Sequence, residues 1–482
     1  MADGGSSRRG VSRRGFLTVA VSAIVAGVVA GVGAYYAGTL AAPIQEVVKE
    51  VTKTVTTTTT LAPGAPYTTT VTATAPPTTV TTTVTTTVTA TPTTPTKPLL
   101  EGQEVRVGVV LPISGALATF GQQGRRGVEL AAEEINGAGG ILGAKIKLFV
   151  EDFAGDPKVA LTATEKVITV DKVHVVSGAY MSAAISTMQE PCERYKVPLL
   201  AIGGAADELT AKGYKYFFRN VQSASEFTQA TMEFVKEVIK PKTVGIVYEK
   251  TLRGESTKNA FLKLAEQYMF TVVAEEGYPA GSLDFKPLIE KLKAANPDVL
   301  LFVAYITDAV LMAKQMDEVG YKPKAVVVEA GMQNIDLLEL AGKYVKGWFI
   351  QTQYWPDRNY PSYNDVYEVG LKFWKKFGKP LDNIACDGYL NLYILKDAIE
   401  RAKSLDPEAI RNAIAETDLF LPWFGHIKYG PNGHRINALD TFAMCQILPA
   451  KPDTPWQANG LSFYAVWPEK MKTTEPIHPM PT

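Results

Sequence analysis

Apolar and polar positions alternate along most of this chain in a way that predicts short buried strands separated by amphipathic helices. Residues 105–111 form an apolar run rich in β-branched residues, which suits a buried parallel strand. Apolar side chains then recur near helical spacing over residues 125–135, and Gly139 and Gly140 follow that stretch. Glycine accepts the positive φ that a helix end requires. With a second strand over residues 146–150, this region predicts one strand–helix–strand unit.

The same alternation continues through two further blocks of the chain. Strands are predicted over residues 173–176, 197–202, 243–248, 271–276, 299–303, 325–328 and 348–351, with helices between them. Residues 425–429 and 442–448 are expected to form an antiparallel pair. We therefore predict an α/β fold with two doubly wound parallel-sheet lobes and a hinged cleft between them.

The expected boundaries of the lobes follow from this order of elements. Residues 103–220 and 352–418 are assigned to the first lobe, residues 221–351 and 419–448 to the second, and the proline-rich residues 449–482 to a loosely packed tail. Ligands of such sheets bind beyond the carboxyl ends of the parallel strands. The loops that matter for function are thus predicted to follow Leu111, Val176, Ile202, Tyr248, Val303 and Val328.

The N-terminal segment has the features of an export signal that stays in the membrane. Residues 1–15 carry Arg8, Arg9, Arg13 and Arg14, and an uncharged hydrophobic signal or anchor is predicted over residues 16–42. The stretch Ser-Arg-Arg-Gly-Phe-Leu that begins at Ser12 resembles a twin-arginine export signal, and an ordinary signal anchor is the alternative. No cysteine follows the apolar run, which argues against a lipoprotein anchor.

Residues 43–102 are expected to form a threonine-rich stalk or linker. Their composition, dominated by Thr, Val, Pro and Ala, cannot bury enough apolar area to offset the entropy of ordering. Threonine with proline is typical of O-glycosylated stalks, and the low-complexity part would extend on the order of 140 Å. A stalk is useful only when its near end is held, so we favour an uncleaved anchor that tethers the protein to the outer face of the cell membrane.

Composition and motifs argue against several other classes of protein. Lys+Arg and Asp+Glu are both 49, so no global field favours nucleic acid. The three cysteines are too few for a disulfide framework and are expected to be buried thiols. The four histidines lack metal-ligand spacing, and the sequence Asp152 to Pro157 is interpreted as a helix cap rather than a metal loop. No enzyme, metal or cofactor is predicted, and a binding role is favoured.

Four motifs together resemble the type I periplasmic solute-binding proteins, in the branch that serves branched-chain amino acid ABC importers. They are VGVVLPISG, FGQQGRRGVELAAEEIN, AGGILGAKI and the Asp-x-x-x-Asp-Pro that starts at Asp152. The resemblance covers roughly residues 105–448. It implies a hinged clamp that captures a small ligand and docks on ABC transporter permease subunits.

The resemblance also implies where a ligand would bind. Family members hold a ligand carboxylate with a serine hydroxyl and backbone N–H groups, which places Ser182 in that role with Met181 beside it. The next family loop falls on Gly203 and Ala205. The aromatic walls of the family site correspond to Phe120 and Tyr305, although both positions also suit ordinary core aromatics.

Three positions depart from the family pattern. Ala205 stands where the family has a ligand-binding threonine, and Arg253 stands at an aromatic position. The carboxylate that neutralises a ligand ammonium falls on Ala330, with Glu329 one residue earlier. Burying an ammonium without a partner costs several kcal/mol. If Glu329 points away, we therefore expect a ligand without a free ammonium, and Arg253 suggests an anionic or carbonyl group unless it is only a solvated rim charge.

These features predict the extracytoplasmic substrate-binding component of an ABC importer, with an amino-acid-like, carboxylate or amide ligand. Two alternatives stay open. One is an extracellular sensing domain that uses the same clamp without transport, and the other is a glycosylated surface protein that binds no small ligand.

Overall fold

The computed structural model describes residues 73–75, 78–80, 97–329, 333–353, 364–422, 424–452, 454 and 456–480. The chain divides into two compact units, residues 1–96 and 97–482. In the first unit the described residues form two short antiparallel strands, β1 (Ala73–Ala75) and β2 (Thr78–Val80). The predicted arginine-rich segment and membrane anchor lie outside the described residues. Within the described part of the chain, no helix has the length and apolar character needed to cross a membrane.

The first lobe of the unit 97–482 is built on a five-stranded parallel sheet with the order β4-β3-β5-β6-β7. Its strands are β3 (Glu104–Leu111), β4 (Lys145–Asp152), β5 (Val175–Gly178), β6 (Leu199–Ala201) and β7 (Phe217–Arg219). The apolar run predicted as the first strand pairs on both sides, with β4 and with β5. This explains why nearly all of its side chains are buried.

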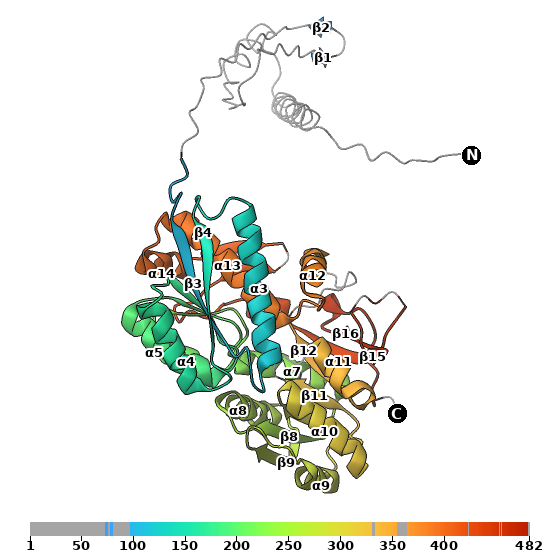
Figure 1. Cartoon of the computed structure of the whole chain (residues 1–482). Helices are drawn as coiled ribbons and strands as arrows, with labels where there is room; N and C mark the ends of the chain where they lie inside the picture. The colour runs from blue at the N-terminus through green and yellow to red at the C-terminus, as the bar shows by residue number, and fades with distance from the viewer. Residues whose placement is uncertain are drawn as a thin grey trace, which may run out of the picture. The chain divides into compact units, whose positions relative to one another are not determined.

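Helices cover both faces of this sheet (Figure 1). The helices of the first lobe are α3 (Ala118–Gly137), α4 (Pro157–Thr169), α5 (Ser182–Tyr195), α6 (Glu208–Ala211), α13 (Asn383–Ala402), α14 (Pro407–Ala415) and α12 (Asn364–Phe377), which lies against α3. The predicted cap is confirmed, because the Asp156 side chain accepts a hydrogen bond from Lys158 N at the start of α4. Helices α3 and α13 touch backbone to backbone, since a Cβ on Gly127 would lie 2.0 Å from the Ala385 carbonyl oxygen.

The second lobe is built on a seven-stranded sheet with the order β16-β15-β12-β11-β10-β8-β9. Its strands are β8 (Thr243–Glu249), β9 (Thr271–Tyr278), β10 (Val299–Val303), β11 (Val326–Glu329), β12 (Phe349–Thr352), β15 (Ala443–Pro449) and β16 (Leu461–Trp467). Strands β8 to β12 are parallel, and β15 and β16 add an antiparallel edge.

The helices of the second lobe follow the predicted alternation with its strands. They are α7 (Ala224–Phe234) with a π-helical extension over Val235–Ile239, α8 (Leu252–Gln267), α9 (Lys286–Ala295), α10 (Ile306–Val319), α11 (Ile335–Ala341) and the 3-10 turn Gly342–Val345. Two further 3-10 turns, Ala438–Thr441 and Glu469–Met471, flank the antiparallel edge.

The C-terminal part of the chain differs from its prediction. The residues expected to form a loose tail include β16, whose side chains are buried against β15. A short apolar run between prolines was enough for an edge strand. The predicted pairing of residues 425–429 with residues 442–448 is wrong, because β14 (Gly425–Lys428) closes a local hairpin with β13 (Asp418–Leu421). Strand β15 instead pairs with β12 and β16.

The predicted boundary at residue 418, where the chain was expected to pass from the first lobe to the second, also lies later in the sequence. Arg219 of β7 forms a β-bridge with His434, and the Tyr429 hydroxyl donates a hydrogen bond to Asn220. The segment from β13 to Arg435 therefore packs on the first lobe, and the chain enters the second lobe only at the turn before β15.

The two lobes contact each other directly in this structure. Asn334 Nδ2 of the second lobe donates to Asp382 Oδ2 of the first at 2.6 Å. Lys379 lies 3.0 Å from Asp336, which also accepts a hydrogen bond from Thr119 at 3.1 Å. These contacts describe a closed arrangement of the lobes.

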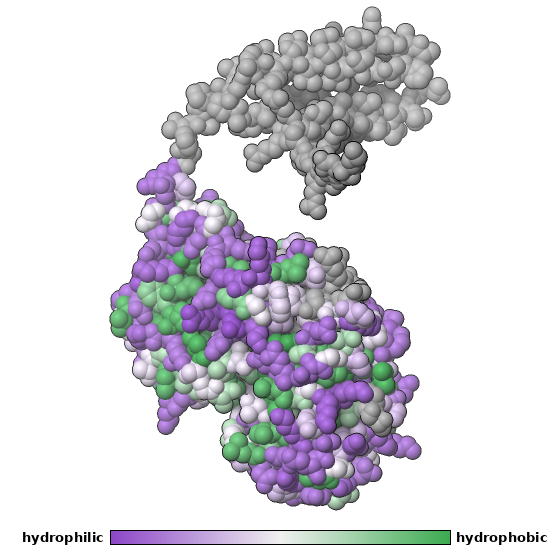
Figure 2. Space-filling model, turned by 45° about the vertical axis from the view of Figure 1, so that its right-hand side comes forward, coloured by the Kyte–Doolittle hydropathy of each residue, from purple (hydrophilic) through white to green (hydrophobic). Residues whose placement is uncertain are grey.

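The surface drawn in Figure 2 is mostly hydrophilic, with apolar residues in small separate groups. The large apolar side chains with the greatest exposure, Met269, Leu283 and Val170, belong to different elements and do not form a cluster in the sequence. Isolated exposed apolar residues are normal for a folded domain. These isolated apolar residues do not indicate a binding surface, and the predicted ligand site lies in the cleft between the lobes.

Candidate functional site

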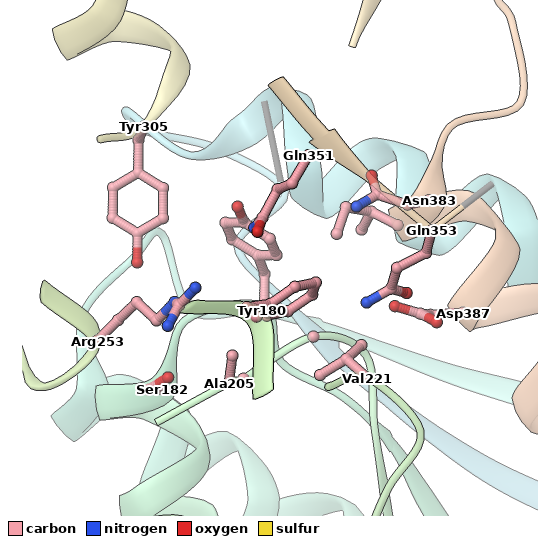
Figure 3. A pocket seen from close by; sticks show the side chains of 14 residues that line it. Tyr180, Ser182, Ala205, Val221, Arg253, Tyr305, Gln351, Gln353, Asn383 and Asp387 are labelled. Carbon is pink, nitrogen blue, oxygen red and sulfur yellow. The ribbon is translucent and has the colours of Figure 1, made fainter. Parts of the chain in front are cut away.

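A small pocket lies between the two lobes, with lining residues from both (Figure 3). The lining residues are Tyr180, Ser182, Gly203, Gly204, Ala205, Val221, Phe227, Arg253, Tyr305, Gln351, Gln353, Asn383, Ile384 and Asp387. Four of the six predicted loops, those after β5, β6, β8 and β10, supply half of these residues. The prediction that the pocket lies at the carboxyl ends of the parallel strands thus agrees with the structure.

Arg253 brings a buried positive charge to the pocket wall. It lies in the first turn of α8, and the adjacent Gly254 permits a close turn after β8, because a Cβ there would lie 1.8 Å from the Glu249 carbonyl oxygen. The Arg253 side chain donates to Thr257 Oγ1 and lies 5.6 Å from the centre of the Phe227 ring. These contacts fix the guanidinium, so the alternative of a solvated rim charge is wrong.

Glu329 is the partner of Arg253 rather than a lining residue of the pocket. Glu329 Oε2 lies 3.5 Å from Arg253 Nη2 and accepts a hydrogen bond from Thr228 at 3.3 Å. Burial raises the pKa of Glu329, while Arg253 and Thr228 act in the opposite direction. Residues of its own lobe therefore engage Oε2, whereas Oε1 is buried without a hydrogen-bond partner among the described residues.

Ser182 supplies a hydroxyl from the first lobe. It is the first residue of α5, and its Oγ accepts a hydrogen bond from the Ala206 N–H at 3.2 Å. Its own hydrogen can then be donated into the pocket. The opposing loop after β6 turns through Gly203 and Gly204, both at positive φ, which brings backbone rather than side chains to the ligand space.

Aromatic rings form one wall of the pocket and span the cleft. The Phe120 and Tyr180 rings are stacked with centroids 4.2 Å apart, and Tyr305 of the second lobe meets Tyr180 edge to face at 5.7 Å. Phe120 lies behind Tyr180 and does not line the pocket itself. Such a wall suits an apolar or aromatic part of a ligand.

The opposite end of the pocket is polar and belongs to α13 and the end of β12. Gln353, Asn383 and Asp387 lie together on the side of the pocket away from Arg253 (Figure 3). Asp387 is fully buried, and burial raises its pKa well above the usual range, with Arg435 opposing and Asp382 adding to the shift. The two ends of the pocket thus differ in their hydrogen-bonding chemistry.

The structure brings five predicted site residues together and leaves three aside. Ser182, Gly203, Ala205, Arg253 and Tyr305 line the pocket. Phe120 stacks on Tyr180 in the aromatic wall, and Met181 is the N-cap residue of α5. Glu329 lies behind Arg253, and Ala330 is outside the described residues.

The sequence did not single out the polar residues on α13 and β12. Asn383 and Asp387 are four residues apart, so they share a face of their helix. That spacing of two polar residues near the start of α13 was the one available signal.

A metal centre finds no support in the described part of the chain, where no group of three or more His, Cys, Asp or Glu side chains could hold an ion. The three cysteines are buried thiols, as predicted.

Two α/β lobes that enclose a pocket at their strand ends define a two-lobed ligand-binding protein. A profile of the Periplasmic binding protein family matches residues 104–447. The chain belongs to this family, whose members are extracytoplasmic binding proteins rather than enzymes.

Individual relatives agree with this assignment. A Leu/Ile/Val-binding protein homolog from Brucella abortus is 30% identical over 333 residues, which are 66% of this chain and 82% of the relative. The leucine-binding protein LivK from Thermotoga maritima is 23% identical with a TM-score of 0.67, over 75% of this chain and 98% of the other. A solute-binding protein of an ABC transporter from Rhodopseudomonas palustris, in complex with 3,4-dihydroxybenzoic acid, is 19% identical with a TM-score of 0.65, over 75% and 96% of the two chains. These two structures share the type I fold.

Proposed function

We propose that this protein is the extracytoplasmic substrate-binding component of an ABC importer and captures a small carboxylate by closing its lobes on it. The observation that carries the proposal is the meeting of Arg253 from the second lobe and Ser182 from the first in one pocket. A carboxylate that bridges these groups is bound only when the lobes are together.

The chemistry of this end of the pocket favours an anion. Arginine binds carboxylates through paired N–H donors, and a serine hydroxyl with nearby backbone adds further donors. The names of the relatives support the same group, since leucine and 3,4-dihydroxybenzoic acid both carry a carboxylate. Tyr180 and Tyr305 would pack against the apolar part of either kind of ligand.

In the second lobe, the position at which the family resemblance places an acid for the ligand's α-ammonium offers little to that group. Glu329 is engaged with Arg253 and Thr228 and does not line the pocket. Ala205 replaces the family's threonine at the pocket wall. A carboxylate or amide without an α-ammonium therefore fits this end better than leucine itself.

Binding would work through the equilibrium between open and closed lobes. A ligand shifts that equilibrium only by its differential affinity for the two states. Contacts from Ser182 on one side and Arg253 on the other exist together only in the closed state. The closed lobes would then dock on the permease subunits, whose ATPase supplies the work.

We also propose that the N-terminal segment tethers the binding unit outside the cell. The arginines before residue 15, the apolar residues 16–42 and the threonine-rich stalk support export, with the twin-arginine route as one possibility, and retention at the membrane. A tether keeps the binding unit close to its permease.

Thermal unfolding of the full chain, purified in detergent, tests the proposed ligand class. The panel is amino acids, amides, aliphatic carboxylates and aromatic carboxylates. A ligand at 100 times its Kd stabilises the folded state by about 2.7 kcal/mol, so a true ligand raises Tm measurably. A rise with carboxylates is expected. No rise with any compound would support the non-binding alternative instead.

A further inference from the structure

The end of the pocket formed by α13 carries hydrogen-bond acceptors that lack donors. Neither carboxylate oxygen of Asp387 has a hydrogen-bond partner among the described residues, although the side chain is fully buried. Gln353 Oε1, in the same part of the pocket, is likewise without a partner there (Figure 3). Gln351 Oε1 and Asn383 Oδ1, which line the same pocket, also lack a partner there. Buried polar atoms in folded proteins are nearly always paired, so these acceptors need an explanation.

The Gln353 oxygen cannot become a donor by turning. Gln353 Nε2 donates to Gln222 Oε1, which fixes the orientation of the Gln353 amide with its oxygen as an acceptor. Burial raises the pKa of Asp387, and a donor on the ligand would favour its ionised form, which has acceptors only. The neighbouring amides of Gln351 and Asn383 can present either an oxygen or an N–H, so they adapt to whatever binds beside Asp387.

A structural ion pair does not explain Asp387. Arg435 is close enough to lower the pKa of Asp387, yet it makes no hydrogen bond to it. The Arg435 guanidinium instead donates to the His426 carbonyl oxygen and to Asn437 Oδ1. Asp382, the other charged group on this side, raises the pKa of Asp387 and so works against a charged carboxylate.

We infer that Asp387 is a second ligand anchor and that the ligand is a carboxylate carrying a hydrogen-bond donor, an amino or hydroxyl group, at its far end. This inference rests on the proposed function, because it takes Arg253 and Ser182 as the anchor of the carboxylate. It places the ligand's donor beside α13 of the first lobe, on the opposite side of the pocket from Arg253 (Figure 3).

The two ends of the pocket then match the two ends of the ligand. Arg253 and Ser182 provide donors, Asp387 and Gln353 provide acceptors, and the Tyr180 ring lies between them. A ligand with an apolar far end would leave the acceptors of Asp387 unpaired in a buried site. A site that hydrogen-bonds a polar group of its ligand strongly rejects analogues without that group.

The test is calorimetric titration of the full chain, purified in detergent, with two matched pairs of probes. The first pair is 4-hydroxybenzoate and benzoate, and the second is 5-aminopentanoate and pentanoate. We expect at least one donor-bearing probe to bind about tenfold or more tightly than its partner. The pair that shows this preference tells a hydroxyl donor from an ammonium.

Variants of α13 assign the preference to Asp387. In Asp387→Leu the acceptors are gone, so we expect the ratio of the two Kd values to fall to within about threefold. Asp387→Asn keeps the shape and removes the charge, and it should weaken the amino-bearing probe more than the hydroxyl-bearing one. Asp397→Asn, on the same helix in a surface ion pair with Arg401, is the control and should leave both ratios unchanged.

Each outcome bears on the inference. Binding of carboxylates without any preference for the donor, or a preference that survives in Asp387→Leu, overturns the inference and leaves the proposed function standing. No binding by any of the four probes contradicts the proposed ligand class and the inference with it. A lower Tm for unliganded Asp387→Asn than for wild type also overturns the inference, because a structural carboxylate would stabilise the fold whereas an unpaired one does not.

Discussion

Arg253 and Glu329 form a buried ion pair, with 3.5 Å between Nη2 and Oε2, directly behind the ligand pocket. Both side chains are almost completely shielded from solvent. The pair explains two departures from the family pattern together, because the arginine at an aromatic position is matched by the acid displaced from the neighbouring position. Under the proposed function, Arg253 gives the second lobe's side of the pocket N–H donors for a carboxylate.

Replacing Arg253 alone should destabilise the protein. In Arg253→Met the buried Glu329 carboxylate loses its charge partner, and breaking a buried pair in this way costs about 3 kcal/mol. In the double variant Arg253→Met with Glu329→Gln no unpaired charge remains, so most of that loss should be recovered. Urea unfolding of the three proteins measures the difference. Equal losses in the single and double variants would mean that the pair does not interact.

The close contact between α3 and α13 should be sensitive to a single methyl group. Gly127→Ala would place a Cβ 2.0 Å from the Ala385 carbonyl oxygen, so the helices must separate and we expect a loss of about 2 kcal/mol or more. Gly137→Ala, at the end of the same helix, meets nothing within 4 Å and should be neutral or slightly stabilising. Thermal unfolding compares the two variants, and a similar Tm for both would contradict the packing described here.

Asp382 should make the stability of the protein depend on pH. Its pKa is raised to about 6, first because burial disfavours the charged form, while hydrogen bonds from the Ala385 N–H and Asn334 oppose the shift. An unfolded aspartate titrates near 3.9, so the folded protein holds a proton that the unfolded chain releases. The contribution of Asp382 to stability is therefore full below about pH 4 and is lost as the pH rises through about 6.

The matching variant is Asp382→Asn, which keeps the helix cap because asparagine is also a good N-cap residue. Between pH 4 and pH 7.5 the unfolding free energy of wild type should change relative to the variant by on the order of 2 kcal/mol, in the direction of lower stability at the higher pH. Urea unfolding at the two pH values measures this. The same pH dependence in both proteins would show that Asp382 does not hold the proton.

Much of the fold follows from local patterns in the sequence, and the exceptions have physical causes. The run at residues 105–111 is apolar enough on both faces to specify a central strand, and β3 occupies Glu104–Leu111. The apolar run of β16 was missed because it is short, lies between prolines and depends on β15 for its pairing. The hairpin of β13 and β14 won over the longer-range pairing because its strands are separated by only a few residues.

The site was predictable only where it lies at the ends of parallel strands. Ser182, Arg253 and Tyr305 follow strands β5, β8 and β10, so the order of strands and helices indicates their loops, and the family resemblance indicates the residues. Asp387 reaches the pocket from near the start of α13, and its place depends on how α13 packs against α3 across more than 250 residues of chain. No local pattern carries that information.

The most direct test of the central claim is calorimetric titration of the full chain with 4-methylpentanoate and with leucine, which share a carboxylate and a branched side chain. If Arg253 and Ser182 hold the ligand carboxylate, we expect saturable binding of 4-methylpentanoate with a lower Kd than that of leucine. This binding should weaken about tenfold in Ser182→Ala, through loss of a hydrogen bond to a charged group. It should be unchanged in Ser186→Ala, whose hydroxyl lies on the surface beside Lys212. Equal affinity in wild type and Ser182→Ala, or binding of leucine alone, would contradict a carboxylate held between Arg253 and Ser182.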